Sequence, residues 1–318
     1  SEEDIRTMEI DMTTGKPVKA ILRFFLPLFA GNIMQNLYNV FDTAVVGHIL
    51  GKNALAAVGN SYVPALIINS IILGISSGIL ILLAQVYGAG EIEKAQNCMG
   101  SIQMLVFLIG GGLACIFFLA ARGIFTAMDV PAESIGYATE YLRITALGIP
   151  FLSAYNFYSA VIKAGGDSKM PVKYMSVSCF MNIVLDYVFV AALRLGIRGA
   201  AFATVLSQIV AAGLVVFYLD RKDKGALLFR PNFKYVRPIF RLGITGVVQN
   251  GASAVSMFFI QGAVNRFGVN EISAYTSAYK IESVLTIPAV NLGTALSVFI
   301  AQNTGAENYE RVRRGLRD

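Results

Sequence analysis

The sequence predicts an all-α fold, a polytopic membrane helix bundle. Of its 318 residues, 55% are hydrophobic and only 14% are charged, which leaves more apolar surface than a soluble core of this size can hide. The charges fall in short clusters between apolar runs of roughly 20 to 28 residues, the length that a helix needs to cross about 30 Å of hydrocarbon. That spacing fits helices and does not fit the shorter strands of a membrane barrel.

Eight apolar runs predict the membrane-spanning helices. In chain order they lie at about residues 20–46, 55–85, 100–121, 138–162, 172–193, 197–219, 239–265 and 275–301. The loops after the first, third, fifth and seventh runs contain five basic residues: Lys52, Arg122, Arg194, Arg198 and Arg266. The segments on the opposite side contain 19. Because basic residues accumulate on the cytoplasmic side, both ends of the chain are predicted to be cytoplasmic.

The runs differ in the special residues that they contain. The first includes Pro27, which removes one backbone hydrogen bond and favours a kink. The third includes three glycines at 110–112, which permit another helix to approach closely. The sixth is followed by the longest polar connection, residues 221–238, which we interpret as a linker between two bundles. The eighth contains Lys280 and Glu282, which do not share a helix face and are either a binding feature or charges near the helix end.

The basic balance of the chain, a net charge of +6, does not indicate a nucleic-acid partner. The Lys and Arg residues lie between apolar runs and form no basic stripe with interleaved aromatic residues. The first 17 residues are too acidic and polar for a secretory signal, so the N-terminus is expected to stay in the cytoplasm. The tail, ENYERVRRGLRD, is expected to be a basic amphipathic segment on the inner membrane surface.

An internal repeat relates the two ends of the chain. A shift of 217 residues aligns Gly51 with Gly268, Asn53 with Asn270, Tyr62 with Tyr279, Ala84-Gln85 with Ala301-Gln302, and Gly88-Ala89 with Gly305-Ala306. Same-direction repeats separated by an even number of spans imply parallel halves related by an axis along the membrane normal, a plan that recurs in secondary transporters. The sequence therefore predicts a complete six-helix N-lobe and the first two helices of a pseudo-symmetric C-lobe.

This organisation divides the chain into five predicted segments. They are a cytoplasmic N-terminal segment (1–19), the N-lobe (20–219), a cytoplasmic linker (220–238), the start of the C-lobe (239–304) and a basic cytoplasmic tail (305–318). Because the second copy stops after two helices, we expect a truncated pair of six-helix halves. We also expect a monomer in the cell membrane.

Two carboxylates, Asp42 and Asp186, lie inside apolar runs. An ionised carboxylate at membrane depth costs about 2.5 to 3.5 kcal/mol, so such residues usually face a polar interior and handle protons, ions or substrates. Helical spacing gives both aspartates polar neighbours on the same helix face. These neighbours are Gln35, Tyr38 and Asn39 for the first and Asn182 for the second. The alternative is a structural role, in which hydrogen bonds pin a polar bundle core.

Four separated motifs carry a family resemblance. They are QNLYNVFDTAVVGHILGKNALAAVG, QVYGAGEIEKA, KAGGDSKMP and NIVLDYVFVAALRLGIRGAAFATVLSQ. Together they resemble the multidrug and toxic compound extrusion (MATE) family, specifically its bacterial branch similar to DinF-type proteins, from about residue 17 to residue 318. The resemblance implies a twelve-helix fold of two six-helix lobes. It also implies export of organic cations and other amphipathic drugs in exchange for H⁺ or Na⁺.

The resemblance nominates a cation-binding cluster in the N-lobe. Its members are Asp42, Asn182, Asp186 and Thr204. Carboxylate, amide and hydroxyl oxygens suit a hard monovalent ion such as Na⁺, whereas protonation of one member of a close carboxylate pair is the other way to relieve its repulsion. Sodium and proton are therefore expected to compete for one cluster.

Further candidate residues surround this cluster. The candidates for the substrate cavity are Gln35, Tyr38, Asn39 and Asn156. A helix-packing hydrogen bond is the alternative role of Asn156. Pro27 resembles a hinge proline whose helix bends when the nearby aspartate changes state, and a role in helix shape alone is the alternative. The seventh run has no acidic residue, so a second cation site is not expected there.

Other functions fit the sequence less well. A lipid-linked oligosaccharide flippase of the same superfamily would need a strongly basic cavity, and apart from residues within a few positions of their ends the runs contain only Arg143 and Lys280 as cations. A truncated, non-transporting membrane scaffold is a further alternative. An enzyme is not expected, because no nucleophile, base and orienting group occur in a recognisable arrangement. No cofactor is expected beyond the coupling ion, and the expected partners are a small-molecule drug or organic cation and the lipid bilayer.

Overall fold

The fold is helical throughout the residues that the structure describes. The computed structural model describes residues 10–50, 58–128, 130, 132–222, 232–264 and 269–317, with side chains omitted for 37–50, 132, 254–255, 257–259, 261–264, 269–281 and 283–284. The elements are α1 (Pro17–Leu50), α3 (Tyr62–Gly88), α4 (Ile92–Leu105), η1 (Val106–Gly111), α5 (Gly112–Ala127), α6 (Ala132–Ala146), α7 (Ile149–Ala164), α8 (Lys169–Asp186), η2 (Tyr187–Ala192), α9 (Ile197–Lys222), α10 (Val236–Val264), α11 (Val269–Gly305) and α12 (Tyr309–Arg317). The two η segments are π-helical.

Six of the described helical segments are long and apolar enough to cross a membrane. They are Pro17–Asn36, Val58–Gly88, Ile92–Ala127, Lys169–Ala192, Ile197–Lys222 and Leu285–Gly305. These segments coincide with the first, second, third, fifth, sixth and eighth predicted runs. The seventh predicted run is also helical over its described residues and forms α10.

The fourth predicted run, 138–162, differs from a single helix. It is divided between α6, which ends at Ala146, and α7, which begins at Ile149. Pro150 occupies the first turn of α7, where its missing N–H has no partner to lose; inside a continuous helix the same residue would break a hydrogen bond. An apolar run alone does not reveal this break.

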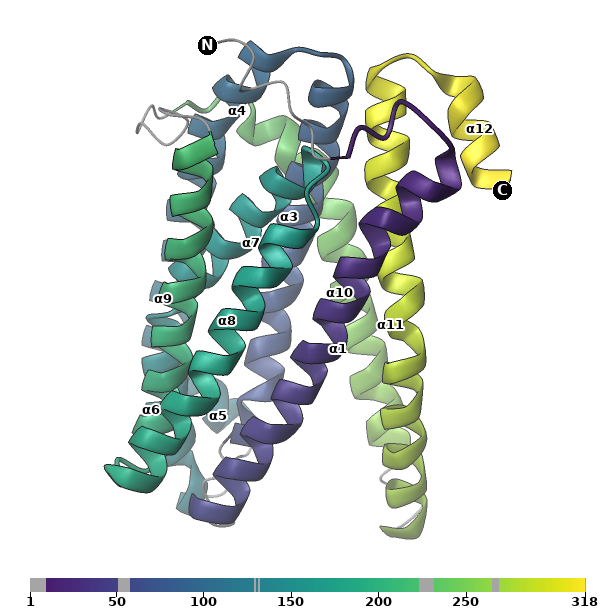
Figure 1. The fold of residues 1–318 in the computed structure, drawn as a ribbon. Coiled ribbons are helices and arrows are strands. Elements are labelled where there is room, and N and C mark those ends of the chain that lie inside the picture. The colour runs from purple at the N-terminus through teal and green to yellow at the C-terminus, as the bar shows by residue number, and fades with distance from the viewer. Residues whose placement is uncertain are drawn as a thin grey trace.

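The helices that follow the predicted linker pack against those that begin the chain. Figure 1 shows α10 and α11 running alongside α1 and α3. The repeat shift relates α1 to α10 and α3 to α11, so the α1–α11 and α3–α10 contacts are equivalent under it. The beginning of α1 and the whole of α12 lie at the same end of the bundle (Figure 1), which we call the terminal end.

Glycines bring α3 and α10 into close contact. A Cβ atom on Gly78 would lie 2.6 Å from the backbone nitrogen of Gly243, and one on Gly246 would lie 3.1 Å from the Cα atom of Gly74. Small residues that let two backbones approach are the usual basis of helix association in membranes, because lipid offers no hydrophobic driving force between helices. This contact therefore fixes α10 on the first part of the chain.

A reciprocal contact joins α3 to α11 at the terminal end. A Cβ atom on Gly88 would overlap the backbone of Gln302, and a Cβ atom on Gly305 would overlap the backbone of Gln85. The repeat pairs Gln85 with Gln302 and Gly88 with Gly305. Two copies related by a two-fold axis produce such an exchanged contact, so the axis passes between the ends of α3 and α11.

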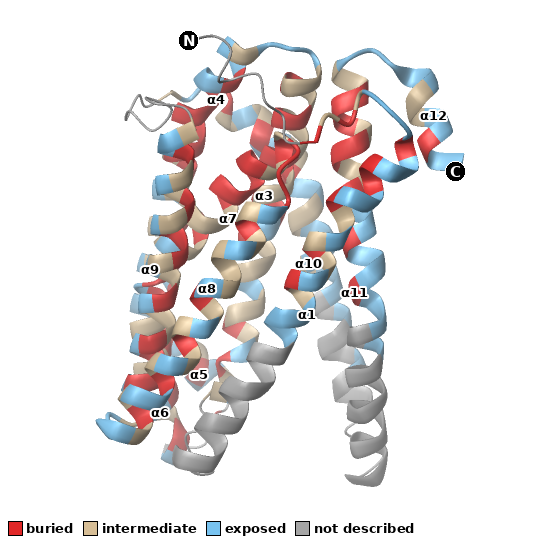
Figure 2. Ribbon diagram, in the orientation of Figure 1, coloured by how far each residue is buried: buried red, intermediate tan, exposed pale blue. Residues whose placement is uncertain are grey.

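The segment before α1 crosses this contact and is held by side chains of α11. The backbone N–H of Met12 donates to Gln302 Oε1 at 3.1 Å, and Asn303 Nδ2 donates to the Met12 carbonyl at 3.0 Å. Gln302 Nε2 also donates to the carbonyl of Ala164, at the end of α7, at 2.8 Å. Met12 is completely buried, whereas the residues next to α1 are exposed (Figure 2). Gln302 thus joins both the segment before α1 and the end of α7 to α11.

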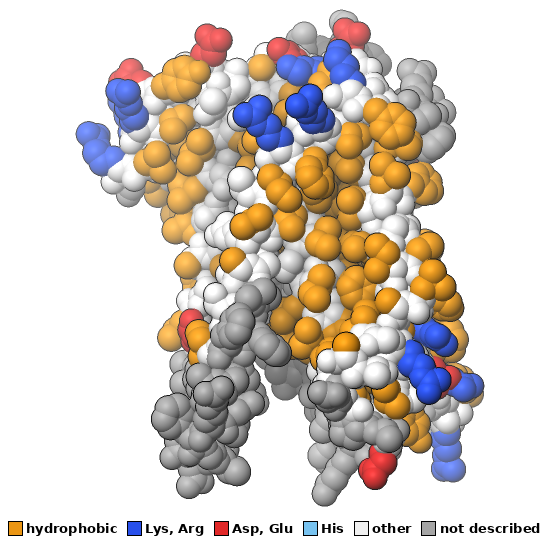
Figure 3. All heavy atoms as spheres, turned by 180° about the vertical axis from the view of Figure 1, so that it is seen from behind, with side chains coloured by type: hydrophobic (Ala, Val, Ile, Leu, Met, Phe, Trp, Pro, Cys, Tyr) orange, Lys and Arg blue, Asp and Glu red, His pale blue; other side chains and the backbone are white. Residues whose placement is uncertain are grey.

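Large apolar side chains cover the outside of the bundle. Leu119, Phe180 and Leu285 expose 76%, 70% and 71% of their surface. Figure 3 shows hydrophobic side chains over the middle of one face, with Lys and Arg gathered toward its two ends. A surface of this kind is stable in hydrocarbon, with the charged ends at the two membrane–water interfaces. The chain is therefore described as a multi-pass membrane protein.

Candidate functional site

A polar cavity lies between helices from both parts of the chain. It has a volume of about 450 Å³ and is lined by residues of α1, α3, α7, α8, α9 and α11. Four of the residues predicted from the sequence line it: Gln35, Asn156, Asn182 and Thr204. These four come from four different helices, so only the tertiary fold brings them together.

Among these four residues, Asn182 is the one whose buried side-chain atoms lack hydrogen-bond partners in the described structure. Its side chain is 1% exposed, and neither its Oδ1 nor its Nδ2 atom has a hydrogen-bond partner among the described residues. A buried polar group without a partner costs about 1 to 3 kcal/mol, and in a native protein it calls for an explanation such as a bound ion or water. The amide of Asn182 is therefore a buried, unsatisfied polar group in the lining of the cavity.

Asp186 lies one helical turn beyond Asn182 on α8 and is also 1% exposed. It is the last residue of α8, and the π-helical segment η2 begins at Tyr187. Such π-helical turns are rare in proteins, and many of those that occur lie at functional sites. The predicted pairing of Asn182 and Asp186 on one helix face is therefore reproduced, and both residues are buried.

One hydroxyl group holds α8 against α9 near these residues, and a second is bonded within α9. Ser178 Oγ donates to the carbonyl of Ser207 at 2.6 Å. Thr204 Oγ1 donates to the carbonyl of Ala200 in its own helix at 3.0 Å. Because the hydroxyl proton of Thr204 is used in this bond, its oxygen lone pairs are the part of the group that can bind a cation.

The remaining predicted residues are placed as follows. Pro27 lies inside α1 and is half-buried. Asn156 Nδ2 donates to the carbonyl of Leu152 at 2.8 Å, which is a bond within its own helix and not a packing bond to another. The side chains of Asp42, Tyr38 and Asn39 lie outside the described residues, although α1 continues through their positions. The side chain of Lys280 is likewise outside the description, and Glu282 is exposed.

The cavity also contains residues that sequence reasoning missed. Lys163 lines it, although we expected this lysine in a loop between two runs. It lies seven residues after Asn156, two helical turns along the same face, and this spacing was the available signal. Asn291 of α11 also lines the cavity and accepts a hydrogen bond at 2.6 Å from Asn32 Nδ2 of α1. No acidic residue belongs to the part of the lining that the structure describes.

Asp167, in the KAGGDSKMP motif, has a structural role. Its Oδ1 atom accepts the backbone N–H groups of Lys169 and Met170, each at 3.0 Å, and so satisfies the first turn of α8. Its Oδ2 atom accepts the hydroxyl of Tyr218, in α9, at 2.7 Å. This buried carboxylate therefore fixes the start of the helix that carries Asn182 and Asp186.

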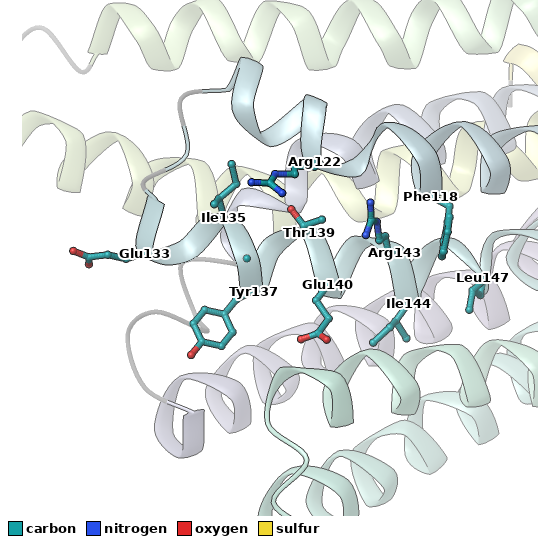
Figure 4. Close-up of a pocket in the computed structure, with 11 residues that line it drawn as sticks. Phe118, Arg122, Glu133, Ile135, Tyr137, Thr139, Glu140, Arg143, Ile144 and Leu147 are labelled. Atoms are coloured by element: carbon teal, nitrogen blue, oxygen red, sulfur yellow. The ribbon is translucent and has the colours of Figure 1, made fainter.

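A second cavity, of about 670 Å³, lies between α5 and α6 (Figure 4). Two of its charged groups, Arg143 and Glu140, interact with other side chains of the protein. The Arg143 guanidinium lies 5.7 Å from the ring centroid of Phe118, and Glu140 forms an ion pair with Arg198 at 2.5 Å. None of the residues predicted for the site lines this cavity, so it is not the candidate functional site.

The described residues contain no group of three or more His, Cys, Asp and Glu side chains that could hold a metal ion. On α8, helical spacing places the amide of Asn182 one turn from the carboxylate of Asp186.

A polytopic helix bundle with a polar cavity at the contact between two related parts of the chain is the architecture of a membrane transporter. The model of the MatE family matches residues 27–188 and 242–317. The chain belongs to this family of multidrug and toxic compound extrusion transporters. Family membership confirms the resemblance found in the sequence and the predicted all-α bundle, and the family consists of transporters, not enzymes.

Individual relatives agree with this assignment. The chain is 31% identical over 304 residues to the probable multidrug resistance protein YpnP of Bacillus subtilis (strain 168), covering 95% of this chain and 68% of the relative. It resembles the solved structure of a MOP superfamily transporter from Pyrococcus furiosus with a TM-score of 0.89 and 26% identity. A multidrug resistance MATE family transporter in an outward-facing conformation gives the same two values. Each alignment covers 97% of this chain and 70% of the solved one, so the chain spans about two thirds of its relatives' length.

Proposed function

We propose that this chain forms part of a cation-coupled antiporter that exports organic cations or amphipathic drugs by alternating access. The observation that carries the proposal is the buried, unsatisfied amide of Asn182 beside the cavity, one turn from the buried carboxylate of Asp186. A structural network would satisfy the Asn182 amide within the protein. A site that binds and releases a ligand leaves this amide ready for it.

The coupling ion is H⁺ or Na⁺, bound by Asp186 and Asp42 with Asn182 and Thr204. A carboxylate binds either ion, and the amide and hydroxyl oxygens supply further ligands for Na⁺. Binding of either ion neutralises charge in a region of low dielectric constant, where an uncompensated carboxylate is costly. Because the same oxygens serve both ions, H⁺ and Na⁺ compete.

The cavity is the proposed substrate site. Its volume of about 450 Å³ falls within the range of about 300 to 1,000 Å³ typical of drug-sized ligands. Its lining combines amide side chains with apolar groups such as Leu28, Leu73 and Val290. The relative YpnP carries the name of a probable multidrug resistance protein, which supports an amphipathic drug as the substrate class.

Alternating access requires two lobes that move against each other. We assign residues 20–219 to the N-lobe and residues 239–304 to the start of the C-lobe, with Pro27 as the hinge of α1. The terminal end is proposed to face the cytoplasm, because most basic residues lie on that side. The unit of function is proposed to be a monomer.

The experiment that tests this function is ion-driven uptake of ethidium by vesicles containing the purified chain. We expect uptake when an H⁺ or Na⁺ gradient is imposed across the vesicle membrane, and loss of that uptake when an ionophore dissipates the gradient. Asp42→Asn is expected to lose the gradient-driven component, whereas Asp220→Asn, at the exposed end of α9, is expected to retain it. Absence of protein-dependent ethidium uptake would support a non-transporting scaffold, and uptake that does not depend on the gradient would contradict ion coupling.

A further inference from the structure

A groove of about 750 Å³ lies at the terminal end, outside the transport cavity. The first three turns of α1 form one wall, and α12 forms the other (Figure 1). Four basic side chains line it: Lys16, Lys19, Arg23 and Arg314. All four are exposed, and no residue of the central cavity belongs to the groove.

The described part of the chain supplies no ion-pair partner to the positive charge of this groove. No Asp or Glu lines it, and none of the four cations forms an ion pair among the residues that the structure describes. Cations held near one another repel, and a bound anion relieves that repulsion. The groove is therefore complementary to a negatively charged group.

Apolar side chains continue the groove along α1 toward the middle of the bundle. Val18, Leu22 and Leu26 follow one another at the four-residue spacing of one helix face. They expose 41%, 46% and 58% of their surface. Lys19 and Arg23 run beside them with the same spacing. One face of α1 thus places a row of cations next to a row of exposed apolar side chains.

The second wall is fixed in position by close packing. A Cβ atom on Gly315 would overlap the ring of Phe299 and would lie 3.3 Å from Pro17 Cβ, so α12 rests directly on α11 and on the start of α1. Arg311 adds hydrogen bonds to the carbonyls of Thr14 at 2.5 Å and Gly15 at 2.6 Å. Arg314, in the following turn of α12, is thereby held opposite the cations of α1.

We propose that this groove binds one anionic phospholipid, with the phosphate of its headgroup between Lys16, Lys19, Arg23 and Arg314 and an acyl chain along Leu22 and Leu26. A soluble anion would use the cations alone and would leave the apolar row exposed. A lipid uses both, and basic pockets at the ends of membrane helices are known to recognise anionic headgroups. The bound lipid joins α1 to α12 without entering the transport cavity.

The proposal is tested with the purified chain in nanodiscs of phosphatidylcholine, into which phosphatidylglycerol is titrated. We expect the thermal midpoint to rise with phosphatidylglycerol and to saturate. Lys19→Gln and Arg314→Gln should each weaken the apparent affinity for phosphatidylglycerol about fivefold. This is the change in affinity that corresponds to the attraction of one Lys or Arg side chain to an anionic lipid surface. The matched control is Arg313→Gln, an exposed neighbour on α12 that does not line the groove.

Two further arms separate the possible outcomes. Soluble glycerol phosphate should not reproduce the rise, because it lacks the acyl chain; equal protection by this anion would overturn the lipid as occupant. Leu22→Gln should weaken phosphatidylglycerol binding while keeping all four cations. Equal midpoints of the variants in pure phosphatidylcholine will show that they fold. A response unchanged in Arg314→Gln, or lost equally in Arg313→Gln, would overturn the site. Neither result depends on whether the chain transports drugs.

Discussion

Replacing Asp186 with asparagine is expected to abolish ion-coupled drug exchange while leaving the bundle folded. The amide keeps the size of the side chain but can neither take up a proton nor supply a negative charge to Na⁺. A coupling free energy between two sites is typically about 1 to 3 kcal/mol, so the variant loses a factor of about 5 to 150 by which the bound ion changes the affinity for the drug. The measurement is ethidium uptake by vesicles under an imposed H⁺ or Na⁺ gradient.

The fold should tolerate this change, because asparagine keeps the size of the side chain and can still form hydrogen bonds. Asp220→Asn is the matched control, since it makes the same chemical change on the exposed end of α9. A thermal midpoint of Asp186→Asn close to that of the unmodified chain will show that any loss of exchange is functional. Exchange at the unmodified rate in Asp186→Asn would remove this carboxylate from the mechanism.

The second large effect is expected at the reciprocal contact between α3 and α11. Gly88→Ala places a methyl group where the backbone of Gln302 lies, so the two helices have to separate. Overpacking of this kind costs about 1 to 3 kcal/mol. We expect a lower thermal midpoint and impaired exchange, because the ends of α3 and α11 can no longer close the terminal end. Gly305→Ala should act in the same way through Gln85.

Gly293→Ala provides the control for this prediction. Gly293 lies on α11, and a Cβ atom there would meet no other atom within 4 Å. Alanine is favoured over glycine in a helix by about 1 kcal/mol, so this variant should be as stable as the unmodified chain or more stable. If Gly88→Ala and Gly293→Ala melt at the same temperature, the close contact does not hold the terminal end together.

The sequence predicts the helices well because a membrane span needs a long apolar run. The repeat also predicts a specific contact: the residues paired by the 217-residue shift, Gln85 with Gln302 and Gly88 with Gly305, meet across the axis. The break between α6 and α7 is less visible, since Leu147 and Gly148 interrupt the helix without interrupting the apolar run.

Some residues of the candidate site could likewise be predicted from the sequence, and others could not. The pairing of Asn182 with Asp186 follows from helical spacing on one element and could be predicted. The contributions of Lys163 and Asn291 could not be ranked from the sequence, because only the packing of α7 and α11 against α8 turns them toward a shared cavity. The hydrogen bond between Asn32 and Asn291 spans 259 positions, and no local pattern indicates it.

The most direct test of the account is thermal unfolding of the purified chain as a function of Na⁺ and pH at constant ionic strength. A ligand that binds only the native state raises stability by RT ln(1 + [L]/Kd), about 2.7 kcal/mol at a concentration of 100 Kd. We predict protection by Na⁺ that weakens as protons compete at lower pH, or a response to pH alone if H⁺ is the only coupling ion. Asp186→Asn and Asn182→Leu should both abolish it. A midpoint insensitive to both ions, or an equal response in the unmodified chain and both variants, would contradict a cation site in this cluster.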